Sequence, residues 1–238
     1  MPIGRDTAIT WLGHGSLDIT SPSGVRILVD PWLTGNPATP EDRRTVEEVD
    51  LMLVTHGHGD HTGDVVAIAT EHKPVVAGQV ELMAYLASLG VENTVGFNKG
   101  GTIEHGGVLV TMTNAFHSSS MEGEDGSIVY TGEPAGFVLT FENGFKVYIA
   151  GDTTVFGDMR LIRELYQPDL AILPIGDHYT MGPKEAALAV RLLGVNHVLP
   201  YHYGTFPILI GRPDDLAREA SDVPGLEVHG IKPGETLT

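Results

Sequence analysis

The residues best suited to chemistry in this chain lie in one short segment, His56-Gly-His58-Gly-Asp60-His61. It contains three imidazoles and one carboxylate, and it follows the apolar run Leu51–Val54, which predicts a buried strand. Neutral imidazole nitrogens and carboxylate oxygens together bind Zn, Mn, Fe, Ni or Co ions. The pattern therefore predicts a metal site at the end of a strand.

The spacing within this segment indicates how its side chains can be shared between ions. Alternate side chains of an extended segment point the same way, so His56 and His58 can reach one ion. Asp60 and His61 follow a glycine that permits a turn, so they can face a second ion. The interleaved glycines also keep side-chain bulk away from the metals.

Further ligands are expected where other strands end. Three candidates each follow an apolar run and precede small or polar residues: His117, Asp152 and His202. Taken alone, Asp152 could cap a helix, and either histidine could be an ordinary loop residue. With the histidine-rich segment already in the chain, all three are predicted to join the metal site.

Apolar periodicity and turn residues predict the elements that position these side chains. Strands are predicted at residues 8–13, 16–20, 25–30, 51–55, 74–77, 102–104, 108–113, 135–141, 146–150, 170–175, 197–200 and 226–229. Helices are predicted at about 63–71, 80–89, 155–166, 183–193 and 213–220. Asn143-Gly144 indicates a type I′ hairpin, and the polar segment 36–50 is interpreted as a surface excursion or a lid over the site.

The order of these elements favours an α/β fold. Strands followed by strand–helix units occur twice, which predicts two sheets packed face to face with helices outside, a four-layer αββα sandwich. No linker divides the two halves, so residues 1–238 are expected to form a single domain.

Composition excludes several classes of partner and ligand. The formal net charge of −17 argues against non-specific nucleic-acid binding, which needs basic side chains to neutralise phosphates. Zero cysteines exclude disulfides and thiolate ligands, so any metal must be held by nitrogen and oxygen. No apolar run is long enough for a membrane span, and no secretory signal is evident, so a cytoplasmic protein is expected.

Several motifs across the chain carry a resemblance to a known family. Besides the histidine-rich segment they are Trp11-Leu-Gly-His14-Gly-Ser16, Asp30-Pro-Trp32, Phe116-His-Ser118, Gly151-Asp-Thr153, Pro174–Pro183 and Tyr201–Pro207. Together they resemble the metallo-β-lactamase fold hydrolases, and within them a lactonase-like branch. That branch is related to L-ascorbate-6-phosphate lactonase and, more distantly, to N-acyl-phosphatidylethanolamine-hydrolysing phospholipase D.

The resemblance implies a metallo-β-lactamase type of αββα sandwich with two divalent ions per chain. One ion would be held by His56, His58 and His117, and the other by Asp60, His61 and His202, with Asp152 bridging them. It also implies that His14 lies near the metals, beside a ligand or the substrate. The commonest true β-lactamases of this fold include a cysteine ligand, which this chain does not have.

Two divalent ions would make the chain a hydrolase. A water bridging them has its pKa lowered towards neutrality, so hydroxide can attack a carbonyl or phosphorus centre. Asp60 or Asp152 could orient this nucleophile. His178, in a loop after a predicted strand, is the best candidate to protonate the leaving group, or else it is an ordinary hydrogen-bonded loop histidine. Tyr179 is one of the residues that could line the pocket.

The predicted activity is hydrolysis of an ester, lactone or phosphodiester of a small molecule. The alternatives are an iron-dependent oxidoreductase on the same fold and a non-catalytic metal-binding protein. The run Phe206–Ile210 could be an interface in a homo-oligomer or a buried strand-like segment. Four further histidines are interpreted as structural or solvated: His72, His105, His197 and His229.

Overall fold

The computed structural model describes residues 4, 6–123 and 125–238, and two seven-stranded sheets form its centre. The first sheet has the strand order β16 (Thr236–Leu237), β1 (Ala8–Gly13), β2 (Ser16–Thr20), β3 (Arg26–Val29), β4 (Leu51–Val54), β5 (Val75–Gln79) and β6 (Thr94–Phe97). The second has the order β15 (Glu227–Val228), β14 (His197–Tyr201), β13 (Leu170–Pro174), β12 (Lys146–Ile149), β11 (Ala135–Thr140), β8 (Val108–Asn114) and β7 (Thr102–His105).

The remaining elements are a small hairpin and the helices. The hairpin pairs β9 (Ser120–Glu122) with β10 (Ile128–Tyr130). The α-helices are α1 (Gly59–Thr62), α2 (Val65–His72), α3 (Val80–Ser88), α4 (Met159–Tyr166), α5 (Pro183–Leu193) and α6 (Pro213–Glu219), and a 3₁₀ helix spans Glu41–Arg43.

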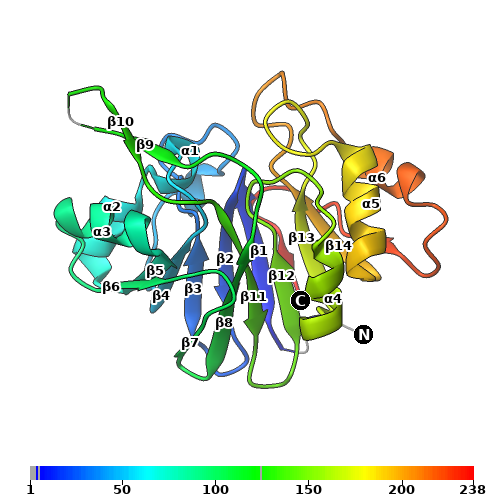
Figure 1. The fold of residues 1–238 in the computed structure, drawn as a ribbon, viewed down its shortest axis with the longest axis horizontal. Coiled ribbons are helices and arrows are strands. Elements are labelled where there is room, and N and C mark those ends of the chain that lie inside the picture. Colours follow the sequence, from blue (N-terminus) through cyan, green and yellow to red (C-terminus); the bar gives the residue numbers. More distant parts are fainter. Residues whose placement is uncertain (1–3, 5, 124) are drawn as a thin grey trace.

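The two sheets pack face to face, and helices cover their outer faces (Figure 1). Side chains from both sheets form one buried cluster between them, including Leu17 and Val29 from the first sheet and Phe137 and Ile172 from the second. A second cluster lies under α4, α5 and α6, and a third lies under α2 and α3. The predicted αββα order of layers is therefore observed.

Helix α5 shows why the long periodic segments were predictable. Proline occupies its first turn, where its fixed φ is suited to a helix start. Ala186, Val190 and Leu193 are buried on one face, and Gly194, with φ of 64°, ends the helix in the left-handed conformation. By contrast, α4 begins at Met159, so the predicted helix start at residue 155 was wrong.

Short elements were the ones that sequence patterns missed. The strands β6, β9, β10 and β16 have two to four residues each and contain no fully buried residue, so they give no apolar signal. The equally short strands β3 and β4 were predicted because they are mostly buried and apolar. One turn of helix, α1, also includes Asp60 and His61, for which the sequence indicated only a turn at the preceding glycine. In the β11–β12 hairpin Gly144 has φ of 80° but Asn143 is not left-handed, so the turn is not type I′. The Gly144 N–H instead bonds the carbonyl of Phe141 at 2.9 Å, which closes a longer hairpin loop.

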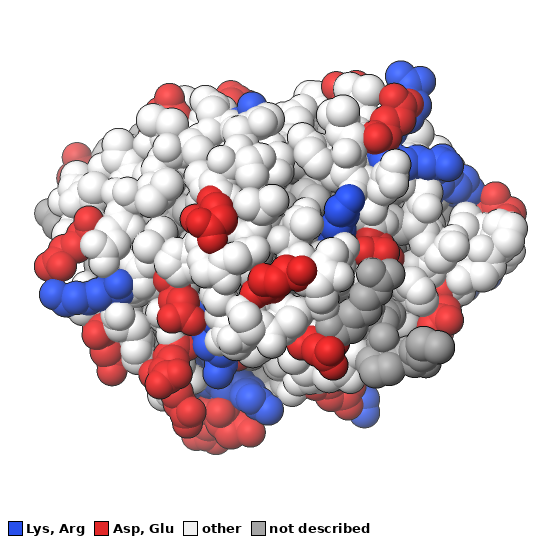
Figure 2. All heavy atoms as spheres, turned by 90° about the horizontal axis from the view of Figure 1, so that it is seen from below, with Lys and Arg blue, Asp and Glu red and all other residues white. Residues whose placement is uncertain are grey.

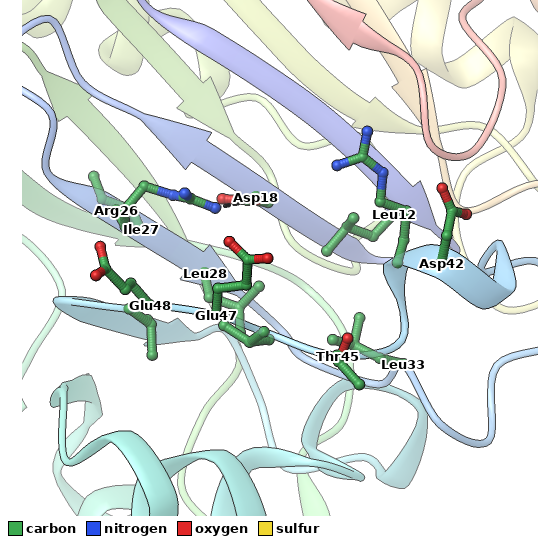
Figure 3. A pocket seen from close by; sticks show the side chains of 13 residues that line it. Leu12, Asp18, Arg26, Ile27, Leu28, Leu33, Asp42, Thr45, Glu47 and Glu48 are labelled. Atoms are coloured by element: carbon green, nitrogen blue, oxygen red, sulfur yellow. Dashed lines mark hydrogen bonds and ion pairs between the residues drawn. The ribbon is translucent and has the colours of Figure 1, made fainter.

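The polar segment 36–50 packs against the first sheet. Residues 42–43 and 45–49 line a hollow together with Leu12, Asp18, Arg26 and Leu28. Figure 3 shows the charged side chains of Asp18, Arg26, Asp42, Glu47 and Glu48 around it. Leu12 and Leu28 belong to the cluster on the outer face of that sheet. Residues 42–49 therefore cover the outer face of the first sheet and do not form a lid over the histidine-rich segment.

The segment Phe206–Ile210 was expected to be either an interface or a buried strand-like run. Within Phe206–Ile210 only Leu209 is buried, and the segment is not a strand. Ile208 and Ile210 are exposed, so the buried strand-like alternative was wrong. Among the described helices, none combines the length and apolar character needed to cross a lipid bilayer.

Candidate metal centre

The seven predicted ligands all follow the carboxyl ends of strands. The histidine-rich loop follows β4, and His117, Asp152 and His202 come shortly after β8, β12 and β14. In the first sheet, β4 is parallel to its neighbours β3 and β5. In the second sheet, β13 is parallel to its neighbours β12 and β14. Strand ends that meet at one edge of the sandwich bring the seven residues together. Helix α1, which includes Asp60 and His61, marks this edge in Figure 1.

A first group of imidazoles consists of His56, His58 and His117. Their closest ring nitrogens, Nε2 of His56 and Nε2 of His117, lie 3.0 and 3.3 Å from Nδ1 of His58. Two nitrogens at the usual Zn–N bond length of about 2.0–2.1 Å lie about 3.3 Å apart around a tetrahedral ion. The three side chains therefore have the spacing of ligands that share one ion.

A second group consists of Asp60, His61 and His202, with His14 beside them. One ligand atom from each of these four residues lies within 4.8 Å of the others. The rings of His61 and His202 stack at a centroid distance of 5.5 Å. This group has both nitrogen and oxygen donors, which suits a borderline divalent cation.

Asp152 lies between the two groups. Its Oδ2 is 4.0 and 3.6 Å from Nε2 of His56 and His117, and 3.4 and 3.1 Å from Nε2 of His61 and His202. Its side chain is only 3% exposed. One carboxylate oxygen thus faces donors of both groups, the arrangement expected of a bridging ligand.

Several buried atoms of this cluster have no hydrogen-bond partner. They are Nε2 of His61, both ring nitrogens of His202, and Oδ1 of Asp152. A buried polar atom without a partner costs about 1–3 kcal/mol, so such atoms are rare unless something else satisfies them. A cation between the two groups would satisfy His61 Nε2 and a nitrogen of His202, so the residues present fit metal binding.

A chain of hydrogen bonds behind the ligands fixes their ring orientation. His61 Nδ1 donates to Oδ2 of buried Asp30 at 2.9 Å. Thr55 donates its hydroxyl to the same Oδ2 at 2.6 Å, so that its oxygen can accept from Nδ1 of His56 at 3.0 Å. With both Nδ1 atoms acting as donors, the rings of His56 and His61 are held so that Nε2 is the nitrogen left to face a cation. Asp30 therefore contacts His61, one of the predicted ligands.

His14 orients Asp60. Burial and the neighbouring charge of His202 lower the pKa of His14 to about 4, so its ring is neutral at pH 7. The ionised carboxylate can only accept, so His14 Nε2 donates to Asp60 Oδ2 at 2.9 Å. Nδ1 then accepts from the hydroxyl of Thr205 at 3.0 Å. Thr205 gave no signal in the sequence because it lies 191 residues from His14.

The backbone at these strand ends is held in an uncommon conformation. His14, Asp30 and His202 have φ of 53°, 47° and 54°, a region that side chains other than glycine seldom adopt. The His202 N–H bonds the carbonyl of His14 at 3.0 Å, which ties the ends of β1 and β14 together. Gly15 is required by crowding, because a Cβ there would lie 2.5 Å from the ring of His61. Local strain of this kind concentrates at functional sites.

The carboxylates of the cluster stabilise positive charge. Burial alone would lower the pKa of His61, but Asp152 and Asp30 raise it well above the usual value. Burial would likewise raise the pKa of Asp152, yet His202 and His61 hold it well below the usual range. For Asp60 the hydrogen bond from His14 and the charge of His61 outweigh burial and lower the pKa. The ionised carboxylates therefore favour a cation between the two groups.

A cavity of about 250 Å³ opens over the first group. Its lining consists of His58, Asp60, His117, Ser118, Asp152 and Tyr179. Ser118, which the sequence indicated only as part of the motif Phe116-His-Ser118, has its hydroxyl 3.3 Å from His58 Nε2. His178 is exposed and is not part of this lining, and its ring packs edge-on against Tyr179 at 4.4 Å. Asp177 and His178 both have positive φ, so the backbone turns tightly just before Tyr179.

Acidification is expected to release the metal of the first group only at a pH below the ordinary pKa of histidine. Burial lowers the pKa of His56, His58 and His117 from 6.5, so these rings stay neutral and able to bind at pH 6.5. After dialysis at stepped pH, the protein should keep at least the one ion per chain of this first group through pH 6.5 and lose it at lower pH. Full retention well below about pH 5 would contradict histidine ligation.

Comparison with known proteins shows the family. Residues 25–203 match the β-lactamase superfamily domain. A UPF0173 metal-dependent hydrolase of Rubrobacter xylanophilus is 56% identical over 232 residues, covering 97% of this chain and 96% of that protein. This chain belongs to the UPF0173 metal-dependent hydrolase family of the β-lactamase superfamily. A further member, from Koribacter versatilis, is 49% identical over 228 residues and covers 96% of each chain.

A solved structure supports the same assignment for the fold. The metallo hydrolase Igni18 of Ignicoccus hospitalis superposes with a TM-score of 0.84 at 34% identity, and the match covers 97% of each chain. The metallo-β-lactamase type of αββα sandwich, predicted from the motifs, is therefore confirmed. The prediction of a metal-dependent hydrolase is confirmed at the level of the family.

Proposed function

We propose that this UPF0173 hydrolase binds two divalent cations per chain and cleaves an ester, lactone or phosphodiester of a small molecule. The observation that carries the proposal is the position of Asp152 Oδ2, which lies within 4.0 Å of imidazole nitrogens from two separate groups. A single ion would need only one of these groups. Two groups that share one carboxylate support a dinuclear centre.

The proposed ligand sets follow these groups. His56, His58 and His117 would hold one cation, and Asp60, His61 and His202 the other, with Asp152 between them. Zn, Mn, Fe, Ni and Co all suit nitrogen and oxygen ligands. When bound, the cations would supply a water with lowered pKa and would stabilise negative charge on the attacked oxygen.

The protein's own residues would orient the reactants and move the protons. Neutral His14 holds Asp60 by one hydrogen bond and so fixes the carboxylate at the base of the cavity. Asp152 and Asp60 would orient the attacking water and accept its proton. Both are ionised near pH 7, since the pKa of each is lowered. The leaving group would receive its proton from the loop that contains His178 and Tyr179.

The cavity favours a carbon ester or lactone within this substrate class. No lysine or arginine is among the described residues that line it, so the chain itself offers no side chain to pair with a phosphate. Tyr179, which lines the cavity, and Phe116, which precedes the lining residue His117 in the chain, are 57% and 54% exposed and offer apolar surface. These features support the proposed lactonase-like branch of the superfamily.

Small molecules rather than nucleic acids are the proposed substrates. The net charge is −17, and on the face shown in Figure 2 basic side chains lie among more numerous acidic ones. A chain that binds phosphate backbones needs a continuous basic surface.

We also propose that residues 1–238 act as one domain, since β16 at the end of the chain pairs with β1 in the first sheet. The exposed pair Ile208 and Ile210 remains a candidate contact between copies in a homo-oligomer.

A screen of turnover with defined metals tests the proposal. The purified protein, loaded in turn with Zn, Mn, Fe, Ni or Co, would be assayed against lactones, carboxylic esters and phosphodiesters, with and without oxygen. We expect metal-dependent hydrolysis that is equal in air and under argon. Turnover that requires oxygen would favour an iron-dependent oxidoreductase. Metal-dependent melting with no turnover of any substrate would favour a metal-binding protein without catalytic activity.

The source of the leaving-group proton can be tested with two variants. Y179F removes the hydroxyl from the cavity, and H178A removes the neighbouring exposed ring. Because Tyr179 lines the cavity, we expect Y179F to lower kcat by about 10²-fold with metal content unchanged. H178A should lower kcat less, through loss of its ring contact with Tyr179. A substrate with a good leaving group should reduce both effects, and H178A activity equal to the parent would remove His178 as a donor.

A further inference from the structure

A second set of metal-binding side chains lies away from the strand-end centre. Its members are His197, Glu227 and His229, and one ligand atom from each lies within 4.8 Å of the others. His197 Nδ1 and His229 Nε2 are 3.2 Å apart, and Glu227 Oε2 is 3.8 Å from the same His197 nitrogen. The sequence alone had suggested that both histidines are structural or solvated.

The sheet holds these three side chains on one face. β14 and β15 are parallel, with His197 opposite Glu227 and Val198 opposite Val228. The two valines pack in the cluster beneath α5 and α6, so the residues that alternate with them project from the other face. The N–H of His229 bonds the carbonyl of Val198 at 2.8 Å, which fixes its place in the register. The three side chains are therefore positioned by backbone pairing and not by a mobile loop.

The geometry within the set matches that of ligands around a small cation. The separation of 3.2 Å between the two ring nitrogens is close to the value of about 3.3 Å for two nitrogens on a tetrahedral zinc ion. A carboxylate oxygen at a slightly greater distance provides a third donor and negative charge. The imidazole-rich donor set favours Zn²⁺, Ni²⁺, Co²⁺ or Cu²⁺ over Mg²⁺ and Ca²⁺, which prefer all-oxygen sites.

We propose that His197, Glu227 and His229 form an additional binding site for one transition-metal ion. The site is separate from the strand-end centre, because His197 begins β14 and His202 follows its end. Five residues of strand at about 3.3 Å each place the two histidines about 16 Å apart. Three protein ligands on a partly exposed edge leave room for solvent or an exogenous ligand in the remaining position.

A titration of the metal-loaded enzyme tests this site. The purified protein with its resident metals would be titrated with Ni²⁺ or Zn²⁺ by calorimetry, and bound metal would be counted after equilibrium dialysis. We expect one ion per chain beyond the resident metals. E227Q and H229N should each weaken binding of this ion by about tenfold or more, with resident metals and substrate turnover unchanged. Excess Ni²⁺ should raise the Tm of the parent and leave that of E227Q nearly unchanged.

His72 provides the matched control. It also lies beside a glutamate, with Nε2 3.9 Å from Oε2 of Glu71, but it belongs to none of the described groups of three ligands. H72N should therefore bind the additional ion as the parent does. Equal binding by the parent, E227Q and H229N would overturn the proposal, as would the absence of any additional ion. Glu227 is 65% exposed, so E227Q keeps the test valid even if H229N is less stable.

Discussion

Replacing Asp152 with asparagine is expected to abolish most activity and to remove at least one cation per chain. Asp152 Oδ2 faces imidazole nitrogens of both groups, at distances from 3.1 to 4.0 Å. Asparagine keeps the size of the side chain but removes the negative charge and presents an amide to the histidines. Both proposed cations would therefore lose a ligand in one substitution. We expect kcat/KM to fall by about 10³-fold, equivalent to about 4 kcal/mol of transition-state stabilisation.

The measurement is metal content by elemental analysis, followed by kinetics with added metal. D158N is a suitable control, because Asp158 is exposed and its side chain makes no capping hydrogen bond to α4. It should bind metal and turn over substrate as the parent does. Parental metal content in D152N, in protein with an unchanged circular dichroism spectrum, would show that Asp152 is not a ligand.

Replacing His58 with alanine is expected to remove one cation and leave the other. His58 is within 3.0 and 3.3 Å of the two other imidazoles in its group, and it belongs to no other group of candidate ligands. Asp60, His61 and His202 do not depend on it. We expect the metal content to fall by one ion per chain and kcat/KM to fall by about 10²-fold or more, because a centre with one cation stabilises less charge.

His58 is only partly buried, so its truncation leaves a space that solvent can enter and should not unfold the protein. The control is H105A, which removes a partly exposed histidine at the end of β7. Unchanged metal content in H58A would reject the first ligand group. Loss of all metal would instead show that the two groups cannot be occupied independently.

The family relationship and the geometry bear on different parts of these predictions. The chain is a UPF0173 metal-dependent hydrolase, and the match extends over nearly its whole length. The number of ions, their ligands and the substrate are proposals that rest on the positions of individual side chains. D152N and H58A test the ligands, the substrate screen tests the reaction, and E227Q tests the additional site. A negative result in one of these experiments leaves the proposals that the others test unaffected.

Much of the fold was predictable because burial leaves a periodic signal. Long elements such as α5 and β8 were found with nearly correct limits, since apolar residues recur along them with the period of a helix or strand. Short elements without an apolar run were not found: α1 and β16 have four and two residues and are formed by tertiary contacts. The segment 36–50 illustrates the same difficulty, since its packing depends on the outer face of a sheet formed elsewhere in the chain.

The sequence by itself determined which residues could bind metal and at which strand ends they lie. Chemistry sets this, since imidazole and carboxylate groups seldom follow a buried strand without a partner. Only the tertiary structure decided how these residues contact one another. The contacts of His14 with Asp60 and of Asp30 with His61 join residues 46 and 31 positions apart. The same is true of His197 and His229, because strand register and sheet packing bring distant side chains together and no local pattern encodes them.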